Sequence, residues 1–584
     1  MSVITTRHSN SRCVITGCCL LLFFASGAST LSADWREDIG YNKLADVLGD
    51  SLPDGSGVSF SLVEAQQGPN GPYFPDTANS LFGAETDPLG SAVSFTDGSG
   101  GQNKGTSSHS NSQAQVIIGN TSSVAPAANQ VTVYEANHYL NSVLNVNSGG
   151  NTNPPRAQDF RVQNFSWIGT FVDATDGDPV PTTAELNLDR ESLRRFDYVI
   201  DTNNVTALVG LNNNLAAIPH LLAHSYNSIA VGRSDGNHSS GLTHLSDYGP
   251  GRSKPDIVSP RPTSSSATST ASSSAIFLHS SATVLGTDAA ESQTMKAILM
   301  AGASKEPFPT WSQIDAGSVW HPLDDTYGAG ELSLYDSYLI TLGGQAVGTT
   351  TTPTPVASHG WDFQNVQPGT GNELLYDFVI PGGSTAEELS IVLAWNAEFL
   401  SPPIDFNSAD PTVADLNLEI VDSTGMTVDF DINDSIVEGL SDSDVDNVEH
   451  LYLADLAAGT YTLKVSSDDL ASDFGLAWRT TTRFDSVSAD FDEDGDTDGA
   501  DFLAWQLGNG TLLGAVHADG DADGDGDVDE DDLAIFDSEV MGTTMSLLSS
   551  SIAAIPEPGS WVLLVAGGCL ALGLRTLPYP SRHQ

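Results

Sequence analysis

Two short acidic segments near the C-terminus carry side chains at the spacing of a cation site. Residues 490–501 and 521–532 each have acidic side chains at loop positions 1, 3, 5, 9 and 12, and glycine at position 6. Calcium takes about six to eight oxygen ligands, and a glycine at that position allows the sharp turn that wraps them around one ion. The sequence therefore predicts two Ca²⁺ sites. The predicted ligands are Asp490, Asp492, Asp494, Asp496, Asp498, Asp501, Asp521, Asp523, Asp525, Asp527, Asp529 and Asp532.

An apolar helix start follows each loop, at residues 502–505 and 533–536, and the two matches are 31 residues apart. The pair resembles dockerin type I repeats. Position 12 is aspartate in both loops, as in that family, whereas standard EF-hands have glutamate at this position. The resemblance implies a small helical calcium-binding module over residues 485–540. It also implies calcium-dependent docking onto a cohesin-type partner, although such repeats also occur as stabilising spacers.

The formal net charge of the 584-residue chain is −54. Residues 485–537 carry 18 acidic side chains and no Lys or Arg, so this one segment accounts for a third of the net negative charge. A protein needs Lys and Arg side chains to bind the phosphates of nucleic acid, and it needs them equally to bind an anionic membrane surface. The composition excludes both as partners.

Both ends of the chain have the composition of targeting segments. Residues 1–33 have a basic start, an apolar core and small residues before Asp34, which predicts a signal peptide. A cysteine box at residues 15–18 precedes the apolar core instead of following it, which argues against lipidation. The four cysteines lie only in these two end segments, so no disulfide framework is expected.

Residues 555–584, after a linker at 541–554, contain Pro556-Glu557-Pro558, an apolar run over 561–574 and trailing arginines. This tail resembles the PEP-CTERM sorting signal of Gram-negative bacteria; a simple tail anchor is the alternative. The resemblance implies recognition by sorting machinery and a transient inner-membrane anchor. We expect the protein to be exported to the cell surface, the outer envelope or the extracellular space.

Residues 34–345 alternate strand-like runs with helical stretches, which favours an α/β domain with a mostly parallel sheet. Ligands of such domains bind outside the carboxyl ends of the strands. The expected strands are 58–63, 130–134, 160–165, 205–209 and 228–231, and a helical stretch is expected over 268–303.

From about Gly55 to Leu342 the chain resembles the subtilisin-like serine proteases. The clearest match is residues 254–260, Lys-Pro-Asp-Ile-Val-Ser-Pro. Before this segment, residues 226–232 match the family strand that ends in VGA. After it, residues 267–273 lie where the family has GTSxAxP. Residues 295–303 match the helix behind the nucleophile, and residues 327–330 match the closing glycine motif. The resemblance implies a serine endopeptidase acting on peptide or protein substrates.

Family roles carry over to four positions of this sequence. Ser269 would be the nucleophile, at the start of a helix, and His109 the general base. Asn212 would donate to the oxyanion, and Glu64 occupies the position of the triad acid.

The motifs depart from the family pattern at several points. The family DTG is Glu64-Ala-Gln, the glycines around the histidine are serines at 108 and 110, and Ala267 replaces the glycine before Thr-Ser. Because Ser269 lies in a Ser/Thr-rich run, a neighbouring serine one or two residues away is an open alternative. A catalytically degenerate pseudo-protease that serves as a binding scaffold is also open, as is a cohesin-docked component of an extracellular complex.

A Thr/Pro linker at 346–359 leads into residues 360–484, which alternate as an all-β domain. This region resembles the jelly-roll, or β-sandwich, domain appended to many secreted subtilases. Asp415, Asn447 and Glu449 are acidic or amide residues in its turns, and capping of turns is favoured over calcium binding there.

Overall fold

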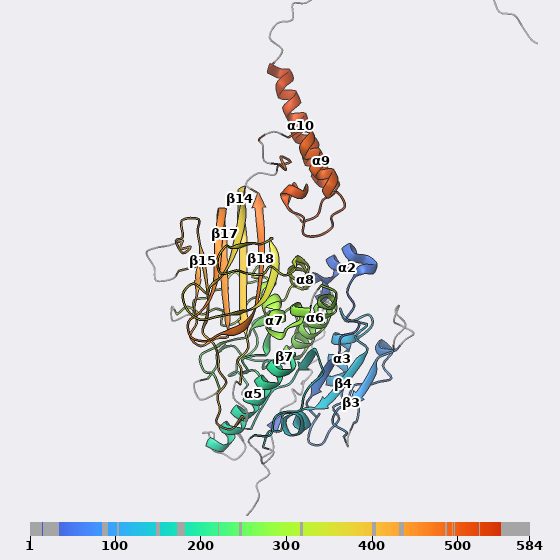
Figure 1. Ribbon diagram of the computed structural model, residues 1–584. Helices are drawn as coiled ribbons and strands as arrows, with labels where there is room; N and C mark the ends of the chain where they lie inside the picture. The colour runs from blue at the N-terminus through green and yellow to red at the C-terminus, as the bar shows by residue number, and fades with distance from the viewer. Residues whose placement is uncertain are drawn as a thin grey trace, which may run out of the picture. The chain divides into compact units, whose positions relative to one another are not determined.

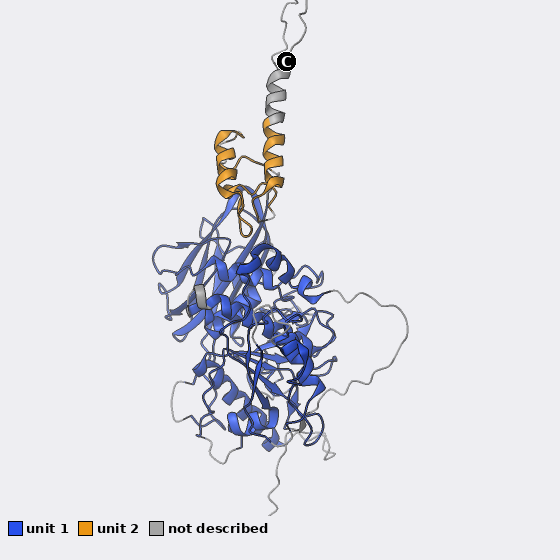
Figure 2. Cartoon of the chain, turned by 90° about the vertical axis from the view of Figure 1, so that its right-hand side faces the viewer, with its two compact units in different colours: residues 1–486 blue, residues 487–584 orange. Residues whose placement is uncertain are grey.

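The computed structural model forms two compact units, residues 1–486 and 487–584, which Figure 2 shows in different colours. It describes residues 14–15 and 34–550, with gaps at 84–91, 102–103, 148–151, 172–181, 220, 245–247, 286, 316–318, 400–403, 431–436, 485–487, 493–494, 496 and 525. Of the predicted segments, the tail at 555–584 lies outside the described residues, as does the signal peptide except for residues 14–15.

A seven-stranded parallel sheet forms the centre of the first half of unit 1 (Figure 1). In the order in which they lie across the sheet, its strands are β11 (Ile257–Ser259), β8 (Ile229–Arg233), β7 (Thr206–Gly210), β5 (Val162–Phe165), β2 (Phe60–Glu64), β4 (Gln130–Glu135) and β3 (Ser94–Asp97). The predicted parallel α/β sheet is therefore confirmed. The strand order reverses around β2, because the chain adds β3 and β4 on one side and then crosses to β5 on the other. Such a switch point opens a crevice at the carboxyl ends of the strands.

Helices pack against this sheet and bury an apolar core that includes Phe165 and Phe196. The helices that matter for the site are α3 (Ser108–Ile118), α5 (Thr183–Asn203), α6 (Ser264–Leu285), α7 (Ser292–Ala301) and α8 (Leu334–Gly343). Shorter helices, α1 (Trp35–Asp38) and α2 (Tyr41–Leu48), precede β2. The predicted helical stretch at 268–303 is two helices, and the first begins four residues earlier than expected. Thr263 caps that start, since its hydroxyl accepts from the backbone N–H of Ser266 at 3.2 Å.

The second half of unit 1 is an antiparallel sheet, as the alternating pattern predicts. Its strands, in spatial order, are β13 (His359–Val366), β18 (Ser472–Phe484), β14 (Leu374–Trp395), β17 (Val448–Ser467), β15 (Leu416–Val421) and β16 (Leu440–Ser441). Strand β12 (Thr354–Pro355), inside the predicted linker, pairs with β14. One face of the sheet carries a buried core with Trp395 and Trp478.

The two halves of unit 1 are packed directly on each other. Gly475 of β18 lies against α7 so closely that a Cβ atom there would be 2.4 Å from the backbone N and Cα of Thr294. The Asn447 amide donates to the carbonyl oxygens of Tyr226 (3.0 Å) and Trp395 (2.6 Å), one from each half. Only glycine fits at position 475 against α7, and Asn447 bridges the two halves through its side-chain amide.

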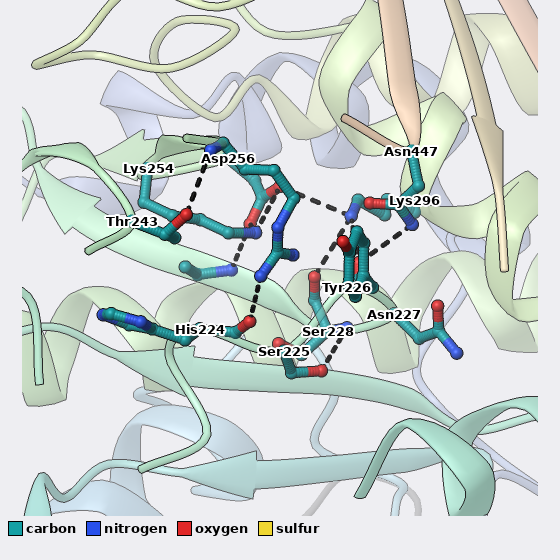
Figure 3. A network of polar contacts seen from close by, with 12 residues as sticks. His224, Ser225, Tyr226, Asn227, Ser228, Thr243, Lys254, Asp256, Lys296 and Asn447 are labelled. Carbon is teal, nitrogen blue, oxygen red and sulfur yellow. Dashed lines mark hydrogen bonds and ion pairs between the residues drawn. The ribbon is translucent and has the colours of Figure 1, made fainter. Parts of the chain in front are cut away.

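The Lys-Pro-Asp segment lies beside this bridge (Figure 3). Asp256 is fully buried and accepts from Lys254 Nζ at 2.8 Å and from the N–H of Ala230 at 2.6 Å, while Lys296 Nζ lies 3.4 Å away. Burial lowers the pKa of Lys254 to about 8. Burial alone would raise the pKa of Asp256, but the two ammonium groups lower it. Lys296 also donates to the Tyr226 carbonyl at 3.0 Å, so the ion-pair cluster supports the carbonyl that Asn447 binds.

Unit 2 contains α9 (Gly499–Gly508) and α10 (Glu530–Ser550), each preceded by one acidic loop. Phe491, Trp505, Val528 and Phe536 form its small buried core. In the part of the chain that the structure describes, no helix combines the length and the apolar character needed to cross a bilayer.

Candidate active site and cation loops

Glu64 and His109 are paired at the carboxyl edge of the parallel sheet. Glu64 is the last residue of β2 and is fully buried, and His109 is the second residue of α3. His109 Nδ1 lies 2.7 Å from Glu64 Oε2. Because a carboxylate only accepts, Nδ1 is the protonated nitrogen and Nε2 presents its lone pair. The extra methylene of Glu64, relative to the family aspartate, is accommodated in this pair.

The charge of the Glu64 carboxylate raises the pKa of His109 above its usual value, and this outweighs burial, which acts in the opposite direction. The His109 side chain is 30% exposed, so its ring can be reached from solvent. Within the described residues, Glu64 Oε1 is buried without a hydrogen-bond partner. The contact with His109 is therefore the main interaction that offsets the desolvation cost of burying this carboxylate.

Ser269 does not lie at the start of a helix, where the family resemblance predicts it. It is in the second turn of α6, is fully buried, and its Oγ donates to Gln113 Oε1 at 2.8 Å. The helix starts at Ser264, so Ser269 lies more than one turn from the N-terminal end where the dipole would assist an oxyanion. The geometry does not support Ser269 as the nucleophile.

Ser265 is the serine one turn earlier, in the first turn of α6. It is half-buried, its Oγ donates to the Ser166 carbonyl at 3.1 Å, and Ser166 Oγ lies 3.2 Å from the Ser265 carbonyl. Its backbone N–H has no acceptor among the described residues. Sequence reasoning missed Ser265, although the capping threonine Thr263 just after a proline signals a helix start there.

Asn212 follows β7 and is held beside the start of α6. Its carbonyl accepts from Ser264 Oγ at 3.3 Å and from the Ser239 N–H at 3.2 Å. Its side-chain amide makes no hydrogen bond to any described residue. Asn212 thus has a fixed backbone next to the helix start and an amide available to a ligand.

The edge after β5 pairs with an extended segment of this same chain. Strand β6 (Gly169–Thr170) pairs antiparallel with β1 (Val14–Ile15). Ser166, whose carbonyl accepts from Ser265 Oγ, lies three residues before β6. The β6 edge, which pairs with an extended backbone, is therefore continuous in the chain with the residue that Ser265 contacts.

The two acidic loops have the same internal geometry. Asp501 Oδ1 accepts from the N–H of Phe491 at 2.6 Å and its Oδ2 from the N–H of Asp498 at 2.7 Å. Asp532 makes the equivalent bonds to Ala522 (2.7 Å) and Asp529 (2.8 Å). The carboxylate at position 12 therefore organises the backbone of each loop.

Carboxylate oxygens converge in both loops. Atoms of Asp490, Asp492 and Asp501 lie within 4.8 Å of one another, as do those of Asp521, Asp523 and Asp532, and those of Asp527, Asp529 and Asp532. Gly495 (φ +100°) and Gly526 (φ +87°) take the left-handed turn expected at position 6. This donor set fits Ca²⁺. Asp494, Asp496 and Asp525 lie outside the described residues, and Asp498 caps α9 through the Ala500 N–H.

No protein-family profile and no curated protein matches the sequence. Among solved structures, the chain is similar to the patellamide maturation protease PatA at 17% identity and a TM-score of 0.30, over 50% of this chain and 99% of that one. It is also similar to the prenylagaramide maturation protease PagA (16%, TM-score 0.32, 50% and 96%) and to a lanthipeptide protease (14%, TM-score 0.32, 52% and 95%). TM-scores this low do not identify a fold, so the functional assignment depends on the strand order and the contacts above.

Proposed function

We propose that this protein is an exported, calcium-stabilised, subtilisin-like serine endopeptidase in which Ser265, His109 and Glu64 form the triad. One observation carries the proposal: Glu64 and His109 are paired at the switch point of the parallel sheet, and the helix of His109 is in register with the helix of Ser265.

The register follows from two contacts between α3 and α6. Ser273 Oγ donates to the Ile117 carbonyl at 2.8 Å, and Ser269 Oγ donates to Gln113 Oε1 at 2.8 Å. Both contacts join residues 156 positions apart, and they are one helical turn from each other on both helices. Both helices run in the same direction, so one turn further toward their N-termini this register pairs His109 with Ser265.

The chemistry follows from these positions. Ser265 Oγ attacks the peptide carbonyl carbon, and His109 Nε2 takes its proton and passes it to the leaving amine. Glu64 holds the ring and stabilises the imidazolium. The free N–H of Ser265 and the Asn212 amide stabilise the oxyanion, and losing one such donor costs about 100- to 1000-fold in kcat. Water then hydrolyses the acyl-enzyme by the reverse proton path.

Three further parts of the proposal concern the surroundings of the site. The β6 edge supports an extended peptide or protein as the substrate. The loops at 490–501 and 521–532 bind Ca²⁺ in a dockerin-like module, and a cohesin-type protein is the partner that such a module would take. The two end segments direct export, with the sorting machinery acting on the tail.

The competing function is a pseudo-protease scaffold, favoured by the resting bond of Ser265 to the Ser166 carbonyl. A fluorophosphonate probe separates the two, because it reacts only with an activated serine. We expect labelling of the wild type, mapped to Ser265 by peptide sequencing and absent in Ser265→Ala. No labelling of folded wild-type protein would refute the peptidase.

A further inference from the structure

We infer that Gln113 and Ser269 are positioning residues, which act through a buried hydrogen bond to hold the helix of His109 in register with the helix of Ser265. This inference rests on the proposed function and assigns Ser269 a different role from nucleophile. Neither residue touches the reacting atoms.

The contact joins the two helices one turn behind the site. Gln113 is 5% exposed and follows His109 by one turn of α3, while Ser269 is fully buried and follows Ser265 by one turn of α6. The 2.8 Å bond between them therefore spans the interface directly under the pair that must react. A shift of either helix along its axis would break this bond and move His109 relative to Ser265 by the same amount.

A directional bond suits this task better than an apolar contact. Apolar side chains tolerate small axial shifts, since dispersion energy changes gradually, whereas a buried hydrogen bond loses strength outside a narrow range of distance and angle. On such a shift the buried side-chain carbonyl of Gln113 would lose its donor, and the Ser269 hydroxyl would keep only the 3.3 Å contact with Ser166 Oγ. A buried polar group without a partner destabilises the fold. The pair thus penalises every register except the one observed.

The same side of α6 is bonded to the end of β5. The Asn164 amide donates to Ser272 Oγ at 2.9 Å, and Ser166 Oγ donates to Asn164 Oδ1 at 2.7 Å. Ser269 Oγ lies 3.3 Å from Ser166 Oγ. The buried polar side chains therefore tie α3, α6 and the segment after β5 into one network, and each of these elements carries part of the proposed site.

The chain offers a matched control one turn further away. Ser273→Ala removes a hydroxyl of the same helix that is bonded to α3, at the Ile117 carbonyl, and to the Val124 N–H. It weakens the same helix pair without removing the contact nearest the site. A merely structural role for Ser269 predicts that Ser269→Ala and Ser273→Ala behave alike.

The test compares fluorophosphonate labelling rates, kcat and KM for a peptide substrate, and melting temperatures of the full chain. We expect Ser269→Ala to slow labelling and to lower kcat by about 10- to 100-fold with KM within about twofold, because a misplacement near 1 Å costs about that much. Ser273→Ala should melt at a similarly lowered temperature with rates within about twofold of wild type. Equal rates in the two variants would overturn the inference.

A double variant covers the case in which Ser269→Ala does not fold. Gln113→Leu with Ser269→Ala replaces both polar partners by apolar groups, which is close to neutral for stability. We expect it to melt near the wild-type temperature and still label slowly; wild-type labelling would overturn the inference alone. Unlabelled wild-type protein, or a label mapped to Ser269, would instead overturn the proposed triad and this inference with it.

Discussion

His109 Nδ1 lies 2.7 Å from Oε2 of Glu64, a carboxylate that is fully buried at the end of β2. This pair defines the electrostatics of the site. A buried carboxylate with no other described partner stabilises a positive charge on the ring it contacts, and in the proposed mechanism that charge develops on His109 during acyl transfer.

The pH profile should reflect this pair. Glu64 raises the pKa of His109, and only the neutral ring accepts the proton of Ser265, so activity should rise with pH through an apparent pKa above 6.5. In Glu64→Gln the negative charge is gone, and we expect the acid limb of kcat/KM to move to lower pH and kcat to fall by about 10⁴-fold. An acid limb at the same pH in both proteins would contradict the pairing.

Folding stability should depend on pH through the same group. Since the folded pKa of His109 is raised, the ion pair stabilises the fold fully below the unfolded pKa of about 6.5. The contribution is lost as the pH rises through the folded value. Urea unfolding at a series of pH values should give a smaller dependence in His109→Gln than in the wild type; identical dependence would show that another group titrates.

Replacing Glu64 by the aspartate of the subtilisin-like proteases should lower the proposed activity. Glu64→Asp shortens the side chain by one methylene, so the carboxylate would no longer reach His109 without a backbone shift. We expect kcat to fall by about 10- to 100-fold with little change in KM. Kinetics at the plateau of the pH profile check this, and activity equal to or above wild type would mean that β2 adjusts freely.

Calcium binding should divide evenly between the two loops. Asp501→Ala and Asp532→Ala each remove the carboxylate that holds one loop together, and we expect calorimetric titration of the chelator-treated full chain to lose one of two sites in each variant. Asp531→Ala, which removes an exposed neighbouring carboxylate, is the control and should keep both. Two sites in all three variants would exclude these loops as the ligands.

The contact between β18 and α7 predicts a large effect from one methyl group. Gly475→Ala would place Cβ 2.4 Å from the backbone of Thr294, and neither backbone can yield without moving its element. We expect a loss of about 1–3 kcal/mol in the free energy of unfolding. Gly499→Ala, with no atom within 4 Å of the new Cβ, is the control and should change stability little.

The acid and the base of the pair can be proposed from the sequence only through the family resemblance, because the motifs around Glu64 and His109 both depart from the family pattern. Glu64 directly follows the expected strand at 58–63, and His109 lies in α3, a helix that the sequence pattern does not predict. Their order along the chain and the carboxyl-edge rule bring them together. Five of the seven strands of the parallel sheet, and the two acidic loops, are predicted from local pattern, whereas β3 and β11 are not.

The proposed nucleophile could not be predicted from the sequence pattern. Ser265 and Ser269 both have an alanine two residues later, at Ala267 and Ala271, so the motif fits two registers one helical turn apart. Which serine faces His109 depends on where α6 starts and how it packs on α3, and that packing is a tertiary property. The contacts of Asn447 with Tyr226 and of Gly475 with Thr294 are hidden for the same reason, since each joins segments separated by more than a hundred residues.

The close approach of Gly475 to Thr294 also bears on proteolysis. A protease that cuts between residues 346 and 359 severs the chain but leaves the contacts of Asn447 and Gly475 in place, since they do not depend on chain continuity there. The nicked protein should stay together as two associated fragments and elute at its original size under native conditions. Ending the chain at residue 345 would instead uncover α7, so the α/β half carries its antiparallel sheet as an obligatory cover.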